Sequence, residues 1–186
     1  MATKTAAASN IRFKATLHRP AEQEKGEAWT FLVLPKAASS KLPSRSMSSV
    51  EGTLNDAPFA ATLEPDGQGS HWLKVDEKLR KAAKVEPGDK VELEIHPAEQ
   101  EPEPEVPDDL RRALADAPDA RAVWDDITAV ARRDWIHWIT SPKKPETRVR
   151  RVEVTCDKLA SGQRRACCFD RSGMYSKAFA APEAAD

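Results

Sequence analysis

Apolar and polar side chains alternate along several short segments in the first half of the chain. The pattern covers residues 11–18 and 91–95, and a period of two is typical of a strand with one buried face. Residues 28–34 are almost continuously apolar, which predicts a strand that is buried on both faces and ends at Pro35. A further short strand is predicted at residues 71–75.

A hairpin is predicted between residues 50 and 63. Asn55 and Asp56, two residue types that tolerate positive φ, separate two alternating arms there. Because proline lacks an N–H, Pro58 indicates that its arm is a sheet edge or carries a bulge.

Five or six short strands and one helix are therefore expected between residues 10 and 96. The helix follows the strand at 71–75, because Asp76 is a suitable N-cap for a helix that runs to Lys84. Turn-forming residues recur regularly between the strands, which favours a small β-barrel over a βαβ sheet.

Two loops are predicted in this first part, and one of them suggests a chemical role. Residues 36–49 are rich in serine and include Lys36 and Arg45, and they predict a long loop with at most one helical turn. Gly67 and Gly69 lie in a turn that would cradle a phosphate in a P-loop, but the Lys-Ser/Thr pair of a P-loop does not follow them. Turn formation is the simpler interpretation of these glycines.

Residues 97–107 separate the first part from the second. Proline and glutamate alternate there, and we expect an extended, solvated linker. The predicted fold class is α+β, with a small β-barrel that carries one helix at residues 10–96 and a small α-helical domain at residues 108–162. Residues 1–9 and 163–186 are expected to be poorly ordered tails.

Proline and capping residues divide the helical domain. One helix follows Asp108 or Asp109, and another starts at Pro118. The apolar stripe that continues to Trp138 is consistent with a third helix capped by Thr128 and equally with one uninterrupted helix. A last helix is expected from Glu146, after the helix-breaking Pro145, to Leu159, with Gly162 as its C-terminal cap.

Composition narrows the class of protein without giving an activity. The 186 residues carry a formal net charge of -1 and a mean hydropathy of -0.62, so net charge alone predicts no polyanionic partner. No run approaches the roughly 20 apolar residues of a membrane span, and the first ten residues lack the apolar core of a signal peptide. Cys156, Cys167 and Cys168 lack metal-binding spacing and are expected to be reduced thiols, which agrees with a cytoplasmic location.

The sequence contains no arrangement typical of an enzyme. Its four histidines are scattered without HxxxH or HExxH spacing, and neither a GxSxG nor a Cys-His pattern stands out. We therefore expect no catalytic residues, no metal site and no cofactor. His137 is expected to be a solvated helix residue, with a role as a pH switch as the alternative.

Five cations near the start of the last helix form the candidate binding surface: Lys143, Lys144, Arg148, Arg150 and Arg151. Such a cluster can pair with the phosphates of a nucleic acid or of lipid headgroups. The alternative is a solvated face, partly paired with Glu146, Asp134 or the acidic linker. Trp135 and Trp138 share a helix stripe with Ile127 and are predicted to be core residues.

Several motifs resemble known bacterial families. Residues 29–35, 52–59 and 88–93 resemble a bacterial domain of unknown function with a small β-barrel, similar in type to the double-split barrels of AbrB-like regulators. Residues 106–110, the aromatic segment 135–139 and the Lys-Pro-Glu-Thr-Arg-Val-Arg-Arg segment 144–151 resemble the YdeI/OmpD-associated family of bacteriocin-protection proteins. The chain departs from these patterns at Asn55-Asp56, where Asn-Gly is frequent, and at residues 141–144.

Two functions follow from these observations. The resemblance implies a role in envelope stress or antimicrobial-peptide resistance, and it implies no known reaction. The first hypothesis is therefore a non-catalytic interaction protein that binds a protein or peptide partner through its helical module. The second is a nucleic-acid-binding regulator that uses the cations of residues 143–151, by analogy with AbrB-like barrels.

Overall fold

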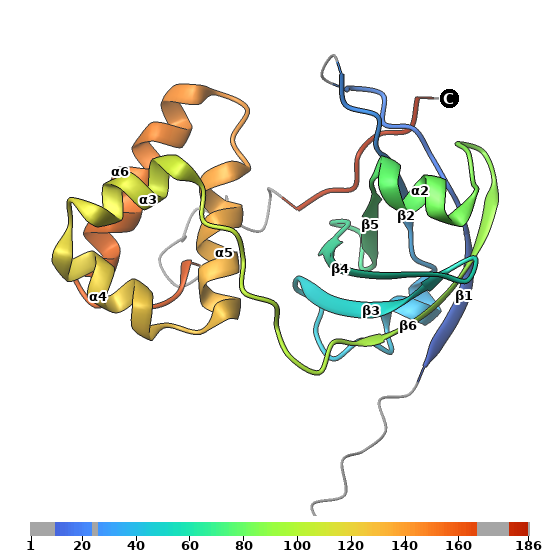
Figure 1. Ribbon diagram of the computed structural model, residues 1–186, viewed down its shortest axis with the longest axis horizontal. Coiled ribbons are helices and arrows are strands. Elements are labelled where there is room, and N and C mark those ends of the chain that lie inside the picture. The colour runs from blue at the N-terminus through green and yellow to red at the C-terminus, as the bar shows by residue number, and fades with distance from the viewer. Residues whose placement is uncertain (1–9, 24–25, 167–178, 186) are drawn as a thin grey trace, which may run out of the picture. The chain divides into compact units, whose positions relative to one another are not determined.

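The computed structural model describes residues 10–23, 26–166 and 179–185, and these form two compact units (Figure 1). The first unit contains the described residues up to Gln100 together with those from Phe179 onward, and the second begins at Glu101. An antiparallel sheet occupies the first unit and helices make up the second, so the α+β class is confirmed.

Six strands form the sheet of the first unit within the described residues. Every pair of neighbouring strands is antiparallel, and the order is β1-β6-β3-β4-β5-β2. The strands are β1 (Ile11–Thr16), β2 (Thr30–Val33), β3 (Ser48–Leu54), β4 (Ala57–Pro65), β5 (His71–Val75) and β6 (Lys90–Pro97).

The sheet curls into a half-barrel around an apolar core. Backbone bonds between His18 and Phe31, with N···O distances of 2.7 and 2.9 Å, connect the chain after β1 to β2 at the opposite end of the strand order. The inward residues of β3 and β6 include Val50, Leu54 and Leu93, all almost fully buried. Two short helices complete the unit: α1 (Lys36–Ser39) and α2 (Glu77–Ala83).

The predicted local signals of the first unit are confirmed at the hairpin and at α2. Asn55 and Asp56 form the β3–β4 turn with φ values of 44° and 70°. Asp76 caps α2, because its carboxylate accepts the backbone N–H of Leu79 at 2.7 Å. Residues 36–49 contain one helical turn, as the sequence allows.

The second unit contains four helices within its described residues. These are α3 (Asp108–Ala115), α4 (Pro118–Asp126), α5 (Ala129–Thr140) and α6 (Pro145–Ala160). The open question at Thr128 is settled in favour of a separate helix, since its hydroxyl accepts the N–H of Ala131 at 3.2 Å. Trp135 is fully buried and Trp138 is 9% exposed, so both are core residues, as predicted.

The C-terminal segment differs from the poorly ordered tail that the sequence predicts for residues 163–186. Ala184 forms a β-bridge with Pro20, and the N–H of Ala185 donates to the carbonyl of Arg19 at 2.8 Å. Phe179 is buried in the first unit. The tail prediction is therefore wrong for residues 179–185, because backbone pairing with a distant loop leaves no local sequence signal. Residues 1–9 and 167–178 lie outside the described residues.

Two glutamates of the segment 97–107 pair with arginines of α5. Glu103 pairs with the guanidinium of Arg132 through bonds of 2.6 and 2.8 Å, and Glu101 pairs with Arg133 at 2.5 Å. These two glutamates therefore connect the middle of this segment to α5. Over the described part of the chain, none of the helices has the length and hydropathy to cross a bilayer.

Candidate functional site

The five cations predicted as a binding surface do not share one environment. Arg151 is 9% exposed and lies inside the helical unit. Its Nη1 donates to the Trp138 carbonyl at 2.6 Å and to the Ser141 hydroxyl at 3.1 Å, and its guanidinium carbon lies 4.9 Å from the centroid of the Trp138 ring. Arg151 therefore ties α6 to the end of α5 and cannot be part of an exposed patch.

Arg148 is committed to a carboxylate. Its Nε and Nη2 donate to the two oxygens of Asp109 at 2.7 and 3.2 Å, which joins α6 to the start of α3. The hydrogen bond from Arg148 holds the pKa of the Asp109 carboxyl below its usual range, with smaller contributions from the Leu110 N–H and the charge of Arg148. Such a two-point pair fixes the orientation of both side chains.

Lys143, Lys144 and Arg150 are the exposed members of the cluster. Arg150 shares the outer face of α6 with the exposed Glu146, four residues earlier, and Glu153, three residues later. The cationic surface that remains is therefore small and interspersed with acidic residues. Binding through these three residues stays a prediction.

His137 is not the solvated residue that the sequence suggests. It is half-buried on α5, and burial lowers its pKa, with Arg133 and Arg151 acting in the same direction. The neighbouring Asp134 is buried, and the loss of hydration raises its pKa although Arg133 opposes this change. The sequence pattern does not indicate this burial, and one of the two arginines near His137, Arg151, belongs to α6.

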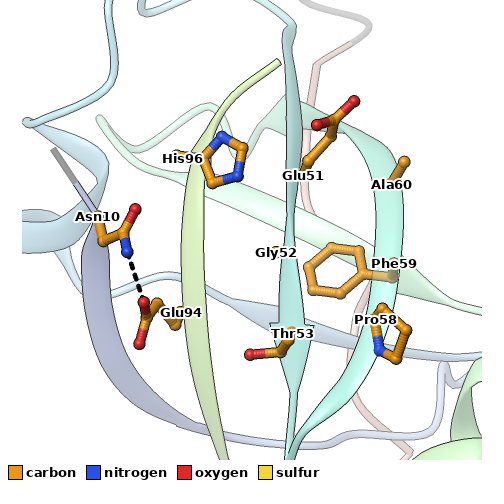
Figure 2. A pocket seen from close by; sticks show the side chains of 9 residues that line it. All are labelled: Asn10, Glu51, Gly52, Thr53, Pro58, Phe59, Ala60, Glu94 and His96. Atoms are coloured by element: carbon orange, nitrogen blue, oxygen red, sulfur yellow. Dashed lines mark hydrogen bonds between the residues drawn. The ribbon is translucent and has the colours of Figure 1, made fainter. Parts of the chain in front are cut away.

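A broad hollow lies on the outer face of the half-barrel, across β6, β3 and β4, and we call it the acidic hollow (Figure 2). Its volume is about 630 Å³. The lining residues are Asn10, Glu51, Gly52, Thr53, Pro58, Phe59, Ala60, Glu94 and His96. Figure 2 shows Glu94 and His96 on the left strand, β6, and Pro58, Phe59 and Ala60 on the right strand, β4. Glu51, Gly52 and Thr53 lie on the middle strand, β3, and Glu51 is the cross-strand neighbour of Ala60.

The pairing of β3 with β6 creates this arrangement. Glu51 lies opposite His96 and Thr53 opposite Glu94, so their side chains project from neighbouring positions on one face. Gly52 permits the close approach of these strands, because a Cβ at this position would lie 2.0 Å from the carbonyl oxygen of Glu94. At Gly52 the lining of the hollow is therefore backbone.

A second, smaller hollow adjoins the first and shares Thr53 and Glu94 with it. It is also lined by Asn55, Asp56 and Glu92 and has a volume of about 280 Å³. The two linings together hold four carboxylates and, among the described residues that form them, no lysine or arginine. The chemistry that this surface offers is cation binding beside an apolar wall.

Two of these carboxylates form ion pairs with cationic residues of the edge strand β1. Arg12 pairs with Glu94 at 2.6 Å and Lys14 with Glu92 at 3.8 Å, both across the β1–β6 pair. The alternation of apolar and acidic residues at 91–95 predicts from the sequence that Glu92 and Glu94 point outward. The approach of Glu51 and Asp56 to them depends on strand register, which that alternation does not give. Over the described residues, no group of His, Cys, Asp or Glu has the arrangement of a metal site.

Comparison with known families supports the resemblance seen in the motifs. Residues 103–162 match the family described as bacteriocin-protection, YdeI or OmpD-associated. Residues 13–95 match a domain of unknown function, DUF1905. The two matches occur in the order that the motifs imply, so the resemblance is confirmed for both parts. No curated protein matches the sequence.

Proposed function

We propose that this chain is a non-catalytic bacterial interaction protein that contributes to protection against bacteriocins, and that its acidic hollow holds a cationic segment of a peptide partner. One observation carries the proposal. Four carboxylates, from Glu51, Asp56, Glu92 and Glu94, line two adjoining hollows whose described linings contain no lysine or arginine. A surface of one sign attracts ligands of the opposite charge and lowers the cost of holding them.

The existing ion pairs leave this surface open to a ligand. The side chains of Arg12 and Lys14 are 72% and 74% exposed, and exposed ion pairs contribute at most about 1 kcal/mol. A lysine of a bound peptide can therefore replace either cation at little cost. Glu51 and Asp56 form no ion pair with any described residue, so their charges are available directly.

The apolar wall determines which cationic partner we favour. Pro58, Phe59 and Ala60 border the hollow on β4, and Ala60 lies beside Glu51 across the β3–β4 pair (Figure 2). An amphipathic peptide carries cationic and apolar side chains together, and it would contact the carboxylates and these apolar residues at once. A protein that binds such a peptide lowers its free concentration, which connects the hollow with the bacteriocin-protection description of the helical part. We place this role in the cytoplasm and in the stress response of the cell.

The experiment is a fluorescence anisotropy titration of the full chain with a labelled cationic amphipathic peptide made of lysine and leucine. The double variant Glu51→Gln and Glu94→Gln should weaken binding at least tenfold, because it removes two charges without changing shape. Glu153→Gln, an exposed carboxylate on α6, is the matched control and should bind like the original chain. Equal affinities of all three proteins would refute the assignment of the hollow.

Nucleic-acid binding by Lys143, Lys144 and Arg150 is the weaker candidate, since Arg148 and Arg151 are engaged within the protein. The parallel with AbrB-like double-split barrels would support it only through fold analogy. A titration with mixed DNA and RNA at two salt concentrations decides the point. Binding that falls steeply with salt, and less steeply in Arg150→Ala, would favour this candidate over the peptide partner.

A further inference from the structure

Three segments of the first unit meet around another cavity, which shares no residue with the acidic hollow. These segments are the short helix α1, the serine-rich loop that follows it, and the β4–β5 turn. The cavity has a volume of about 510 Å³, within the usual range of small-molecule sites. It brings together the serine-rich loop and the glycine turn that the sequence presents as separate features.

The charge of this cavity is opposite to that of the acidic hollow. Lys36 and Arg45 line it, and its described lining contains no carboxylate. Neither cation forms an ion pair with a described residue, and both side chains belong to exposed residues. The adjacent Asp66 is turned to its own backbone, because its Oδ1 accepts the N–H groups of Gln68 and Ser70, each at 2.8 Å.

A buried histidine fixes the two segments that carry the cations. His71 is 2% exposed and contacts the Ser46 carbonyl through Nε2 at 2.8 Å and the Ser39 hydroxyl through Nδ1 at 2.7 Å. Because a carbonyl only accepts, Nε2 carries the proton and Nδ1 accepts the Ser39 hydroxyl in the neutral ring. Ser39 lies one helical turn after Lys36, and Ser46 follows Arg45 directly. One buried ring therefore connects the two segments from which both cations project.

The β4–β5 turn contributes main-chain atoms to the wall of the cavity. The hydroxyl of Ser70 donates to the Leu34 carbonyl at 2.7 Å, which holds the β4–β5 turn against the end of β2. Gly69 lines the cavity with φ of +91°, and a Cβ at this position would meet no atom within 4 Å. The main chain is therefore accessible to a ligand at this point.

We propose that this cavity binds the phosphate group of a small phosphate monoester. Two cations that form no ion pair with any described residue match the two charges of such a group, and the planar guanidinium of Arg45 suits two phosphate oxygens at once. The volume leaves room for an organic part of a few carbon atoms beyond the phosphate. This site is independent of the peptide partner, since it shares no residue with the acidic hollow.

Isothermal titration of the full chain with glycerol 3-phosphate, inorganic phosphate and succinate tests the proposal. We expect both phosphates to bind and succinate to bind at least tenfold more weakly. If glycerol 3-phosphate binds more tightly than inorganic phosphate, the organic part is also recognised. If the two affinities are equal, only the phosphate group is recognised. In both cases the proposal stands, whereas absent binding of both phosphates at millimolar concentration, or equal binding of succinate, overturns it.

Three variants locate the site. Lys36→Ala and Arg45→Ala should each weaken phosphate binding at least tenfold without loss of fold, because both residues are exposed. Lys41→Ala is the matched control, an exposed cation on the same loop that does not line the cavity. Equal affinities of Lys41→Ala and Arg45→Ala would contradict the assignment. Glu51→Gln should leave phosphate binding unchanged, so this site and the peptide site can fail separately.

Discussion

The guanidinium of Arg151 stacks over the ring of Trp138 and donates a hydrogen bond to the backbone carbonyl of the same residue. The ring centroid lies 4.9 Å from Cζ, and the carbonyl oxygen lies 2.6 Å from Nη1. Both contacts are made by a side chain that is only 9% exposed. A cation that belongs to the most basic segment of the sequence thus stabilises the joint between α5 and α6.

Replacing Arg151 should therefore destabilise the protein, and replacing its neighbour should not. Arg151→Ala loses a buried charged hydrogen bond and a cation–π contact, and we expect the free energy of unfolding to fall by about 3 kcal/mol. Arg150→Ala, on the exposed face of α6, should change it by less than about 0.5 kcal/mol. Urea denaturation of both variants measures the difference, and similar midpoints would show that Arg151 is not structural.

The pair of Arg148 and Asp109 predicts a smaller effect that depends on pH. The pair is two-fifths exposed, so Arg148→Ala should cost no more than about 1 kcal/mol at pH 7. The pKa of Asp109 is lower in the folded chain than in the unfolded one, so its contribution is present above pH 4 and disappears as the pH falls through the folded value. The difference in stability between the variant and the original chain should therefore shrink as the pH falls below 4, and a difference that does not change with pH would contradict this origin.

His137 predicts a loss of stability on mild acidification. Burial and the nearby Arg133 and Arg151 lower its pKa below 6.5, so the unfolded chain takes up this proton first as the pH falls. Stability should therefore decrease below pH 6.5, and His137→Gln should reduce this decrease. The pKa of Asp134 is raised, so protonation of Asp134 favours the folded chain as the pH falls further. Asp134→Asn removes this opposing contribution and serves as a second variant for comparison. Unfolding measured from pH 8 to pH 5.5 tests the point, and identical pH profiles for His137→Gln and the original chain would refute it.

Gly52 predicts a strong effect of a single methyl group. In Gly52→Ala the Cβ would lie 2.0 Å from the Glu94 carbonyl oxygen and 2.8 Å from the Cα of Ile95, so β3 and β6 must separate. We expect a loss of about 3 kcal/mol, at the upper end for overpacking. In Gly88→Ala the new Cβ would meet no atom within 4 Å, and only the positive φ of +97° is unfavourable. This variant should lower the free energy of unfolding by about 1 kcal/mol. Thermal unfolding that ranks the two variants in the reverse order would contradict the close approach.

The local elements could be predicted because their signals are local. Asn55 and Asp56 mark a two-residue turn, Asp76 marks a cap, and the alternation at 91–95 marks a strand, each through neighbours in the sequence. The end of the chain could not be predicted in this way, because Ala184 pairs with Pro20 across more than 160 positions. Without this pairing, the sequence of the last residues resembles that of a polar tail.

The candidate site depends on tertiary contacts to a greater extent. The sequence shows how many cationic residues the segment contains, but only the fold shows which of them are exposed to solvent. Arg148 and Arg151 lie three residues apart on one helix, yet the first meets Asp109 and the second meets Trp138. The acidic hollow arises from the register of β3 against β6, which places Glu51 beside a strand whose own glutamates lie more than 40 positions away.

A labelled-protein NMR titration tests the central claim, that the acidic hollow is the working surface of this chain. The full chain, enriched in ¹⁵N, receives the unlabelled lysine–leucine peptide, and the amide shifts are followed residue by residue. We expect the largest shifts on Glu51, Gly52, Thr53, Ala60 and Glu94, with little change between residues 143 and 151. Shifts that concentrate on residues 143–151 while β3 and β6 stay unchanged would contradict it.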